Sequence, residues 1–403
     1  MVTFDFDREI PRAGTASVKY DGAASYYGSA DAIPMWIADM DFAVPEEIMH
    51  ALMDRAAHPV YGYTHYPDSM YEALMTWMKK RHSWEIDRDW IMMCPGVVTA
   101  LHATVLAITQ PDESVIVQSP VYASFFSSIT VTGRRLVLNP LSLEKGRYAI
   151  DFDHLEQLAV DGARLLLFCS PHNPVGRVWT LDELKQIMGI ARRHGLVILA
   201  DEVHADLVYP GITHTTLATL ATNGDSIITA VAPSKTFNIP GLGLSALIVP
   251  KPEHRLALRN VFDKLHLQAC NPFSVIAFEV AYRNGESWLD SLLTYLKVTR
   301  DFVRDYLKDH LPAIRLIEPE GTFLLWLDCR SLGMDDAELK HFFVNDAGVG
   351  LSPGTIFGAD GSRFVRMNIG IPRRIVATAL ERIKCALEAR DGYRIFPYQV
   401  KLG

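Results

Sequence analysis

The sequence has no long apolar run. None of its stretches is apolar for long enough to span a bilayer, and acids and arginines interrupt its start, MVTFDFDREIPRAG. It therefore predicts neither a transmembrane helix nor a signal peptide. It also has no Lys/Arg-rich stretch, and 39 basic against 47 acidic residues give a net charge of −8. We expect a cytoplasmic protein that binds neither nucleic acid nor membrane.

Cysteine is scarce and has no metal-binding spacing. The five cysteines are scattered and never form a C-x-x-C pair; they are Cys94, Cys169, Cys270, Cys329 and Cys385. An odd, dispersed set predicts buried, reduced thiols rather than disulfides or a zinc site. A G-x-G-x-x-G fingerprint after a strand is also missing, which argues against a dinucleotide-dependent oxidoreductase.

The middle of the chain alternates between two patterns. From about residue 90 to 249, short β-branched or apolar runs alternate with helical stretches such as VVTALHATVLAI. This alternation predicts an α/β fold with a mostly parallel sheet covered by helices on both faces. After a helical stretch from 252 to 310, strands are followed by helices. We expect a large domain at 48–285, and a smaller α+β domain formed by 286–403 with the N-terminal segment 1–47.

Polar residues follow several of these strands directly. They are the pairs Ser119-Pro120, Ser170-Pro171, Asp201-Glu202 and Ser234-Lys235. In an open α/β sheet, ligands bind beyond the carboxyl ends of the strands. The pairs therefore point to one site.

Lys235 needs an explanation, because it directly follows an apolar run that reads as a buried strand. A lysine near the interior costs free energy unless it is paired, deprotonated or covalently modified. Asn173 lies in a Pro-bounded turn, where it could merely satisfy the turn, and Asp201 could be a helix N-cap. Together, however, the three supply an amine for an aldehyde, an amide donor and a carboxylate for a ring cation.

The series NPVG, ADEVH and SKTFN, which contains Asn173, Asp201 and Lys235, resembles fold-type I pyridoxal-phosphate enzymes, the aspartate aminotransferase superfamily. The resemblance implies that Lys235 binds the cofactor covalently and then acts as the proton-transfer base. Asp201 would pair with the pyridinium nitrogen, and Asn173 would donate to the ring oxygen. His204 stands where many relatives have a tyrosine on that oxygen, although a structural histidine is the alternative.

Two segments are candidates for the cofactor phosphate. The turn CPGVV begins a helix, so the N–H groups of Gly96, Val97 and Val98 can face an anion. The alternative is an ordinary strand-to-helix turn, which has the same sequence pattern. Ser234 is the second candidate. Many aminotransferases place an arginine eight residues after the lysine for this purpose, and this chain has Gly243 there.

The resemblance also assigns roles to an arginine and three tyrosines. Arg366, in RFVRMNIG, would grip the substrate α-carboxylate with a bidentate fork, where a surface ion pair is the alternative. Tyr122 would stack on the cofactor ring rather than serve packing alone. Tyr61, from the loop YGYTH, would cross a homodimer interface to the partner's phosphate, and Tyr63 is expected near the substrate.

The string IPMWIADMDF, which contains Asp39, looks like the hallmark of the MalY/PatB group of cystathionine β-lyases. The alternative is a generic segment with solvated acids, Asp39 and Asp41. The resemblance implies β-elimination from L-cystathionine or a related cysteine S-conjugate, with Asp39 at the substrate and Tyr61 or Tyr122 protonating the leaving sulfur. An aminotransferase of the same fold, or a lyase with an additional regulatory interaction, remains the rival interpretation.

Overall fold

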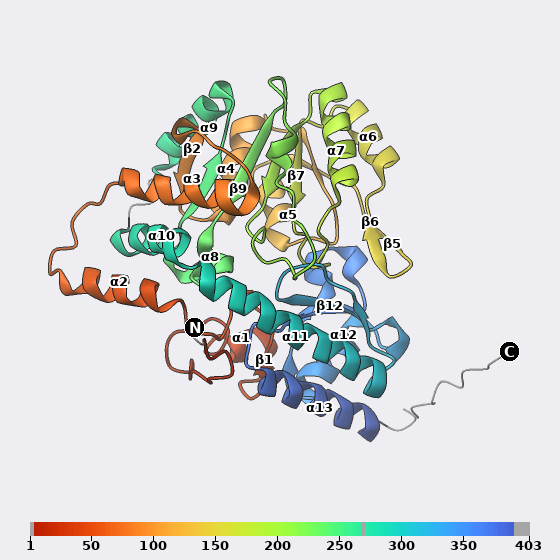
Figure 1. Ribbon diagram of the computed structural model, residues 1–403. Coiled ribbons are helices and arrows are strands. Elements are labelled where there is room, and N and C mark those ends of the chain that lie inside the picture. The colour runs from red at the N-terminus through yellow and green to blue at the C-terminus, as the bar shows by residue number, and fades with distance from the viewer. Residues whose placement is uncertain (1–3, 268–270, 391–403) are drawn as a thin grey trace.

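The computed structural model describes residues 4–267 and 271–390 (Figure 1). A seven-stranded sheet occupies one half of the molecule, in the order β2-β10-β9-β8-β7-β3-β4. The strands are β2 (Ile91–Cys94), β3 (Ser114–Val117), β4 (Arg135–Leu138), β7 (Leu165–Cys169), β8 (Val197–Asp201), β9 (Ile227–Val231) and β10 (Ser245–Ile248). Six of these strands run in the same direction, and β10 runs antiparallel to both of its neighbours, β2 and β9. The prediction of a mostly parallel sheet is confirmed.

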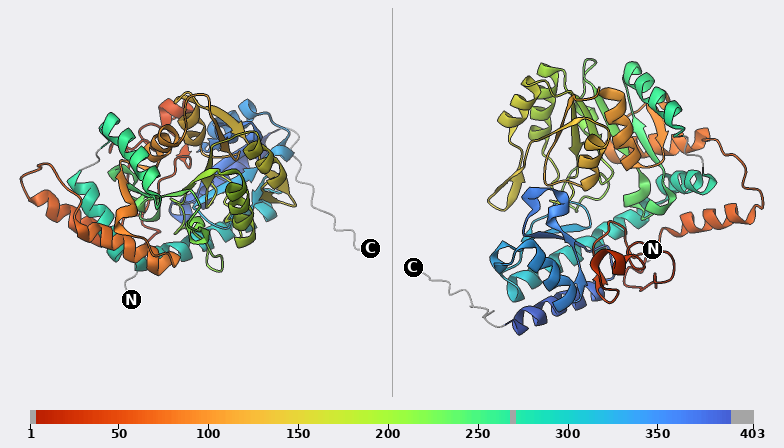
Figure 2. Two further views of the ribbon diagram at one scale, coloured as in Figure 1. Left: turned by 90° about the horizontal axis from the view of Figure 1, so that it is seen from above. Right: turned by 180° about the vertical axis from the view of Figure 1, so that it is seen from behind.

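Helices cover both faces of this sheet (Figure 2). One face packs on α4 (Val97–Ile108), α5 (Ala123–Thr130) and α9 (Pro252–Leu265); the helices of the other half of the core include α3 (Asp68–His82), α6 (Phe152–Val160), α7 (Leu181–His194) and α10 (Pro272–Asn284). In β7, Leu165 and Leu167 pack on the face covered by α4, α5 and α9, and Leu166 and Phe168 pack on the opposite face. Because alternate residues of a strand face opposite ways, a strand buried on both faces is apolar throughout.

Local sequence signals explain where α7 begins and ends. The Thr180 side chain accepts from the Glu183 N–H, and the Glu183 carboxylate accepts from the Thr180 N–H, which forms a capping box. Gly195 ends the helix in the left-handed region at φ 64°, which costs glycine little. The sequence predicts this helix closely because both signals are local.

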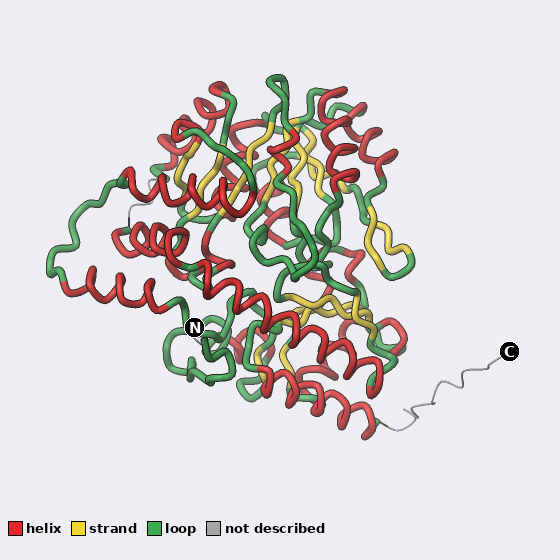
Figure 3. The backbone as a smooth tube through the Cα atoms, viewed as in Figure 1, coloured by secondary structure: helices red, strands yellow, loops and turns green. Residues whose placement is uncertain are grey.

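The second half of the molecule is built on a four-stranded antiparallel sheet, separate from the first (Figure 3). Its strands, in spatial order, are β11 (Arg315–Ile317), β12 (Leu324–Asp328), β15 (Phe364–Asn368) and β14 (Ser352–Pro353). The long helix α11 (Glu286–His310) leads into it, and α12 (Asp336–His341) and α13 (Arg373–Ala389) accompany it. Strands followed by helices were expected here, whereas the domain boundaries themselves stay a prediction.

The N-terminal segment joins this second half. Strand β1 (Ile33–Pro34) pairs in parallel with β13 (Val349–Gly350), and α1 (Ala23–Tyr27) packs nearby. Helix α2 (Glu46–Ala57) then leads to an extended loop that projects from the body before α3 (Figure 1). The remaining elements are the hairpin β5 (Ser142–Glu144) with β6 (Arg147–Ala149) and the short helix α8 (Pro233–Thr236). No described helix is long and apolar enough to cross a membrane.

The cysteines of the described chain follow the sequence prediction except at one position. Cys94, Cys169 and Cys329 are buried free thiols, whereas Cys385 is free but exposed on α13. The prediction of burial is therefore wrong for Cys385, which lies on the solvent side of an amphipathic helix. Cys270 lies outside the described residues.

Candidate active site

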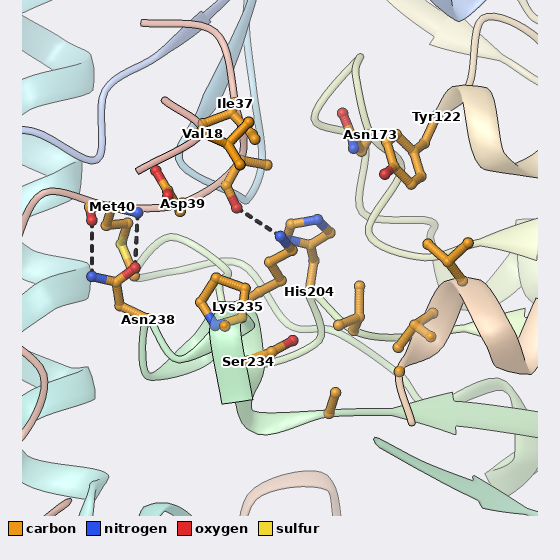
Figure 4. Close-up of a pocket in the computed structure, with 18 of the residues that line it drawn as sticks. Val18, Ile37, Asp39, Met40, Tyr122, Asn173, His204, Ser234, Lys235 and Asn238 are labelled. Carbon is orange, nitrogen blue, oxygen red and sulfur yellow. Dashed lines mark hydrogen bonds between the residues drawn. The ribbon is translucent and has the colours of Figure 1, made fainter. Parts of the chain in front are cut away.

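A cavity of about 1100 Å³ opens at the carboxyl ends of β7, β8 and β9 (Figure 4). Ligand pockets typically enclose roughly 300–1,000 Å³, so this one has room for a cofactor together with a substrate. Most of the residues singled out in the sequence line it; they are Asp39, Gly96, Val97, Val98, Tyr122, Asn173, Asp201, His204, Ser234, Lys235 and Arg366. Of the four pairs that follow strands, Asp201 from one and both Ser234 and Lys235 from another line the cavity, whereas Ser119-Pro120 and Ser170-Pro171 do not.

Lys235 lies on the single turn of α8, directly after β9. Burial lowers the pKa of its ammonium to about 8; the carboxylates of Asp39 and Asp201 oppose the decrease, and Arg366 adds to it. Its Nζ donates to the carbonyl oxygen of Ala38, 2.6 Å away. A lysine with a pKa near neutrality is a nucleophile towards an aldehyde, and this accounts for its place in the interior.

Asp201 ends β8 and is buried. Burial raises the pKa of its carboxyl to about 7, although it accepts a hydrogen bond from the Val203 N–H at 3.1 Å. No other hydrogen bond to this carboxylate is found among residues 4–267 and 271–390. A buried carboxylate on a cavity wall requires a cation, and a protonated pyridine nitrogen meets that requirement.

Arg366 and Asn173 lie side by side on the cavity wall. The Nη1 of Arg366 donates to the Asn173 Oδ1 at 3.0 Å, and its Nη2 donates to the Trp36 carbonyl at 2.7 Å. Burial lowers the pKa of Arg366 to about 10. Its Nε is buried and donates to no atom of the described chain. This orphaned donor fits the predicted grip on a carboxylate.

His204 presents a second orphaned atom. Its Nδ1 is buried without a hydrogen bond in the described part of the chain, and its ring lies edge-on to Phe323. Burial lowers its pKa to about 3, assisted by the charges of Lys235 and Arg366, so the ring is neutral at physiological pH. A neutral imidazole nitrogen without a partner fits a hydrogen bond to a cofactor oxygen.

The proposed phosphate segments are also in place. Gly96 is the N-cap of α4, so the N–H groups of the first turn lie at the positive end of a twelve-residue helix. Ser234 borders the same cavity. Gly243 adopts φ +47°, and a Cβ there would lie 3.2 Å from the Pro95 carbonyl oxygen. A larger residue at this position would therefore have to displace the phosphate-side turn.

Three tyrosines were singled out, and the structure brings one of them into the cavity. Tyr122, the N-cap of α5, lines the wall next to Asn173 (Figure 4). Tyr61 and Tyr63 lie on the projecting loop after α2 and do not line the cavity of their own chain. The Tyr61 hydroxyl donates to the Ala56 carbonyl at 2.6 Å. Their predicted roles at a partner's site stay predictions.

The wall opposite the sheet comes from the N-terminal segment, whose contacts sequence reasoning missed. The side chain of Asn238 accepts from the N–H of Met40 and donates to the carbonyls of Met40 and Phe42, each at 2.9 Å (Figure 4). Asn368 donates to the carbonyls of Ile37 and Asp39 at 2.6 Å. Partners roughly 200 and 330 residues apart leave no local signal.

One alternative interpretation expected the acids of this segment to be solvated, and the structure differs from it. Asp41 is buried, and Asp39 is held by the guanidinium of Arg12. Together with the hydrogen bonds from Asn238 and Asn368, these contacts hold the segment IPMWIADMDF as a wall of the cavity that contains Lys235. The generic-segment interpretation is wrong for Asp41 and does not fit the segment as a whole.

Comparison with known proteins agrees with this geometry. Residues 30–383 match the model of the family described as aminotransferase class I and II. The chain is 40% identical over 385 residues to cystathionine beta-lyase PatB of Bacillus subtilis, a match that covers 95% of this chain and all of the relative.

Solved structures are similar over the same length. A pyridoxal-phosphate-bound putative aminotransferase from Clostridium difficile superposes with a TM-score of 0.93 at 37% identity, covering 95% of this chain and all of that one. Cystalysin from Treponema denticola, which contains pyridoxal 5'-phosphate, gives 0.93 at 35% identity, covering 96% and 99%. The chain therefore belongs to the aminotransferase class I and II family of fold-type I pyridoxal-phosphate enzymes, and within it to the MalY/PatB group.

Proposed function

We propose that the protein is a pyridoxal-phosphate-dependent carbon–sulfur β-lyase. It acts on L-cystathionine or a related cysteine S-conjugate and releases a thiol, pyruvate and ammonia. The observation that carries the proposal is the N-terminal wall. The Lys235 Nζ donates to Ala38, and Arg366 donates to Trp36, so the segment that resembles the lyase hallmark contacts both reactive ends of the site. The PatB relative carries the same activity in its name.

The residues divide the work of binding and proton transfer. Bound pyridoxal phosphate supplies an electron sink for negative charge at the substrate α-carbon. Asp201 keeps the pyridine nitrogen protonated, and Asn173 and His204 bind the ring oxygen. Arg366 holds the substrate α-carboxylate through its free Nε edge. The amine of Lys235, whose pKa is lowered to about 8, removes the α-proton.

Elimination then breaks the bond between the β-carbon and sulfur, and the electron pair leaves with the sulfur. A proton must reach this thiolate; of Tyr61 and Tyr122, the two tyrosines named for this role from the sequence, Tyr122 lines the cavity of its own chain, as Tyr26 does too. The remaining 2-aminoacrylate takes up water and yields pyruvate and ammonia. The N–H groups of Gly96, Val97 and Val98, with Ser234, hold the cofactor phosphate.

The active unit of the proposal is a homodimer. Tyr61 lies on a loop that projects from its own subunit, and both it and Tyr63 are exposed there (Figure 1). In a dimer with shared sites, Tyr61 reaches the partner's phosphate, and Tyr63 approaches the partner's substrate. The absence of an arginine at Gly243 leaves room for such a contribution. A cytoplasmic location remains part of the proposal.

The decisive experiment is the release of pyruvate and thiol from L-cystathionine by protein loaded with pyridoxal phosphate, with no keto acid present. Stoichiometric release of both products supports the lyase. If neither product appears and an added α-keto acid starts amino transfer, the aminotransferase interpretation replaces it. The variant Lys235→Ala serves as the control for uncatalysed release.

A further inference from the structure

An ion pair on the cavity wall takes no part in the bond breaking of the proposed reaction. Arg12 and Asp39 line the cavity that contains Lys235. The Nη1 and Nη2 of Arg12 donate to the two carboxylate oxygens of Asp39 at 3.0 and 2.7 Å. The side chains keep 22% and 17% of their surface exposed, so both can still meet a ligand.

A buried second layer holds this pair in place. Lys19 has no exposed surface and lies 3.1 Å from an Asp41 oxygen and 3.7 Å from Asp39. Asp41 also accepts from Arg12 at 2.6 Å and from the Tyr20 hydroxyl at 2.7 Å. Two cations and two anions balance, so the cluster carries no net charge that a ligand must neutralise. Because the buried ion pairs of this cluster are costly to break, they fix the orientation of Arg12.

The guanidinium of Arg12 still has an unused edge. Its two Nη1 protons and one Nη2 proton are taken by Asp39, Asp41 and the Met40 carbonyl. The Nε–H and the second Nη2–H form the adjacent edge and donate to no atom of the described residues. Two parallel N–H groups on one edge match the two oxygens of a carboxylate.

The cavity therefore has two arginines with an unused donor. Arg366 keeps a buried Nε for the α-carboxylate beside the reacting carbon. Arg12, on the N-terminal wall, offers its edge to a second carboxylate, and Asp39 next to it suits an ammonium group. A substrate that carries an amino-acid group at each end matches this arrangement of charges.

We propose that Arg12 and Asp39 determine specificity by binding the far end of the substrate. Arg12 receives the distal carboxylate on its free edge, and Asp39 accepts the distal ammonium group. The preferred substrates are cysteine S-conjugates whose sulfur substituent carries its own amino-acid group, as a thioether or a disulfide. The inference rests on the proposed lyase activity.

The test compares substrates with and without a charged far end. The ratio of kcat/KM for L-cystathionine to kcat/KM for S-methyl-L-cysteine is measured in holoenzyme and in Arg12→Lys. Lysine keeps the charge that pairs with the buried cluster but has no planar edge. We expect the ratio to fall by about tenfold or more, the scale of a hydrogen bond between charged groups. L-Cystine, measured in parallel, separates disulfides from thioethers.

Arg192→Lys is the matched control, because Arg192 makes a similar two-point pair with Asp225 on the exposed surface. Its ratio should equal that of the wild type. Asp39→Asn provides a second variant, which keeps the volume and removes the acceptor for the ammonium group; it too should lower the ratio. Thermal midpoints and the absorbance of the lysine-bound cofactor check that each variant is folded and loaded.

The outcomes separate the two proposals. An unchanged ratio in Arg12→Lys and Asp39→Asn, or a parallel loss for charged and uncharged substrates, overturns the specificity role and leaves the lyase proposal standing. Failure of the wild type to release thiol from either substrate overturns the lyase proposal, and this inference with it. A ratio that falls for L-cystathionine alone, or for L-cystine alone, identifies which link the pair selects.

Discussion

At the residue scale, burial shifts the pKa values of Asp201 and Lys235, the two groups proposed to face the cofactor, in opposite directions. It raises the pKa of Asp201 to about 7 and lowers that of Lys235 to about 8, because an interior disfavours either charge. Each group is thereby prepared for a partner that the protein chain does not supply. Asp201 awaits a cation, and Lys235 awaits an aldehyde.

Replacing Lys235 by alanine removes both the covalent anchor and the proposed base. We expect the absorbance band of the lysine-bound cofactor to disappear and turnover to fall by at least about a thousandfold, since general-base catalysis alone contributes roughly 10²–10⁴. Absorbance spectra and pyruvate release measure the two effects. Retained lyase activity in this variant would remove Lys235 from the mechanism.

Asp201→Asn should change how the stability of the cofactor-free protein depends on pH. The folded-state pKa, about 7, lies above the unfolded value of 3.8, so the folded protein binds more protons between about pH 4 and 7. Stability contributed by Asp201 is therefore present at low pH and lost as the pH rises through that window. The neutral amide escapes this loss.

Urea unfolding of wild type and Asp201→Asn across pH 4–7 measures the difference. As the pH rises, the free energy of unfolding of the variant should increase relative to that of the wild type, by at most roughly 1.4 kcal/mol per pH unit. His204, whose pKa is lowered by burial, acts in the opposite sense but is common to both proteins. Asp54→Asn, on an exposed face of α2, is the control, and parallel profiles for Asp201→Asn would contradict the expectation.

The candidate site is predictable where its residues end strands. Asp201 ends β8, and Asn173 and Lys235 lie within one turn of the ends of β7 and β9; parallel strands bring these ends to one edge. Arg12 is not predictable in this way. Its partners lie 27 and 29 residues along the chain on irregular segments, so only the folded backbone brings them together.

At the scale of elements, the wall formed by residues 36–42 depends on side chains from both halves of the molecule. Asn238, in the turn after α8, and Asn368, at the end of β15, hold it by hydrogen bonds to its backbone. Residues 36–42 contain no strand, and the two-residue strand β1 ends just before them. Backbone groups that lack a regular partner are satisfied here by amide side chains, which also fix the Ala38 carbonyl over Lys235.

Asn238→Asp keeps the shape of the Asn238 side chain and removes its donors. Two backbone carbonyls would then face a carboxylate, so we expect a loss of about 1–3 kcal/mol in the free energy of unfolding. Residues 36–42 should also exchange their amide hydrogens faster. Urea unfolding and hydrogen exchange measure both effects, with Asn223→Asp in an exposed turn as control. Unchanged exchange in the segment would show that other contacts hold it.

Regular elements were predictable to the extent that their signals are local. Helix α4 has the bounds of the predicted helical stretch VVTALHATVLAI, and α7 is bounded by its capping box and Gly195. Strands β1, β13 and β14 have two residues each and could not be predicted, since they exist only through their partners. After β9 the chain enters α8 at once, because Pro233 suits the first turn of a helix. The helix-breaking residues Pro240, Gly241 and Gly243 come only after α8 has ended.

At the scale of the whole molecule, the projecting loop bears on the proposed homodimer. The loop with Tyr61 and Tyr63 projects away from the cavity of its own subunit, and its side chains remain exposed. An exposed aromatic loop on a monomer marks an interaction surface. If the assembly is a twofold homodimer, each loop contributes to the other subunit's site.

Mixing Lys235→Ala with Tyr61→Phe, under cofactor concentrations at which Tyr61→Phe alone has little activity, tests this sharing directly. Tyr61→Phe removes the hydroxyl proposed for the partner's phosphate, and Lys235→Ala removes the anchor of its own site. In a hybrid dimer, one site combines both defects and the other has neither. After dissociation and random reassembly, half of the dimers are hybrids, so we expect recovery to about a quarter of wild-type activity.

The control mixture combines Lys235→Ala with Asp201→Asn. Both residues line the same cavity of one chain, so exchanging subunits cannot bring the two defects into one site and leave the other site intact. A hybrid of these two therefore retains one defect in every site. Recovery with Tyr61→Phe but not with Asp201→Asn would place Tyr61 across the interface. Equal failure of both mixtures would confine Tyr61 to its own subunit and contradict the shared-site dimer.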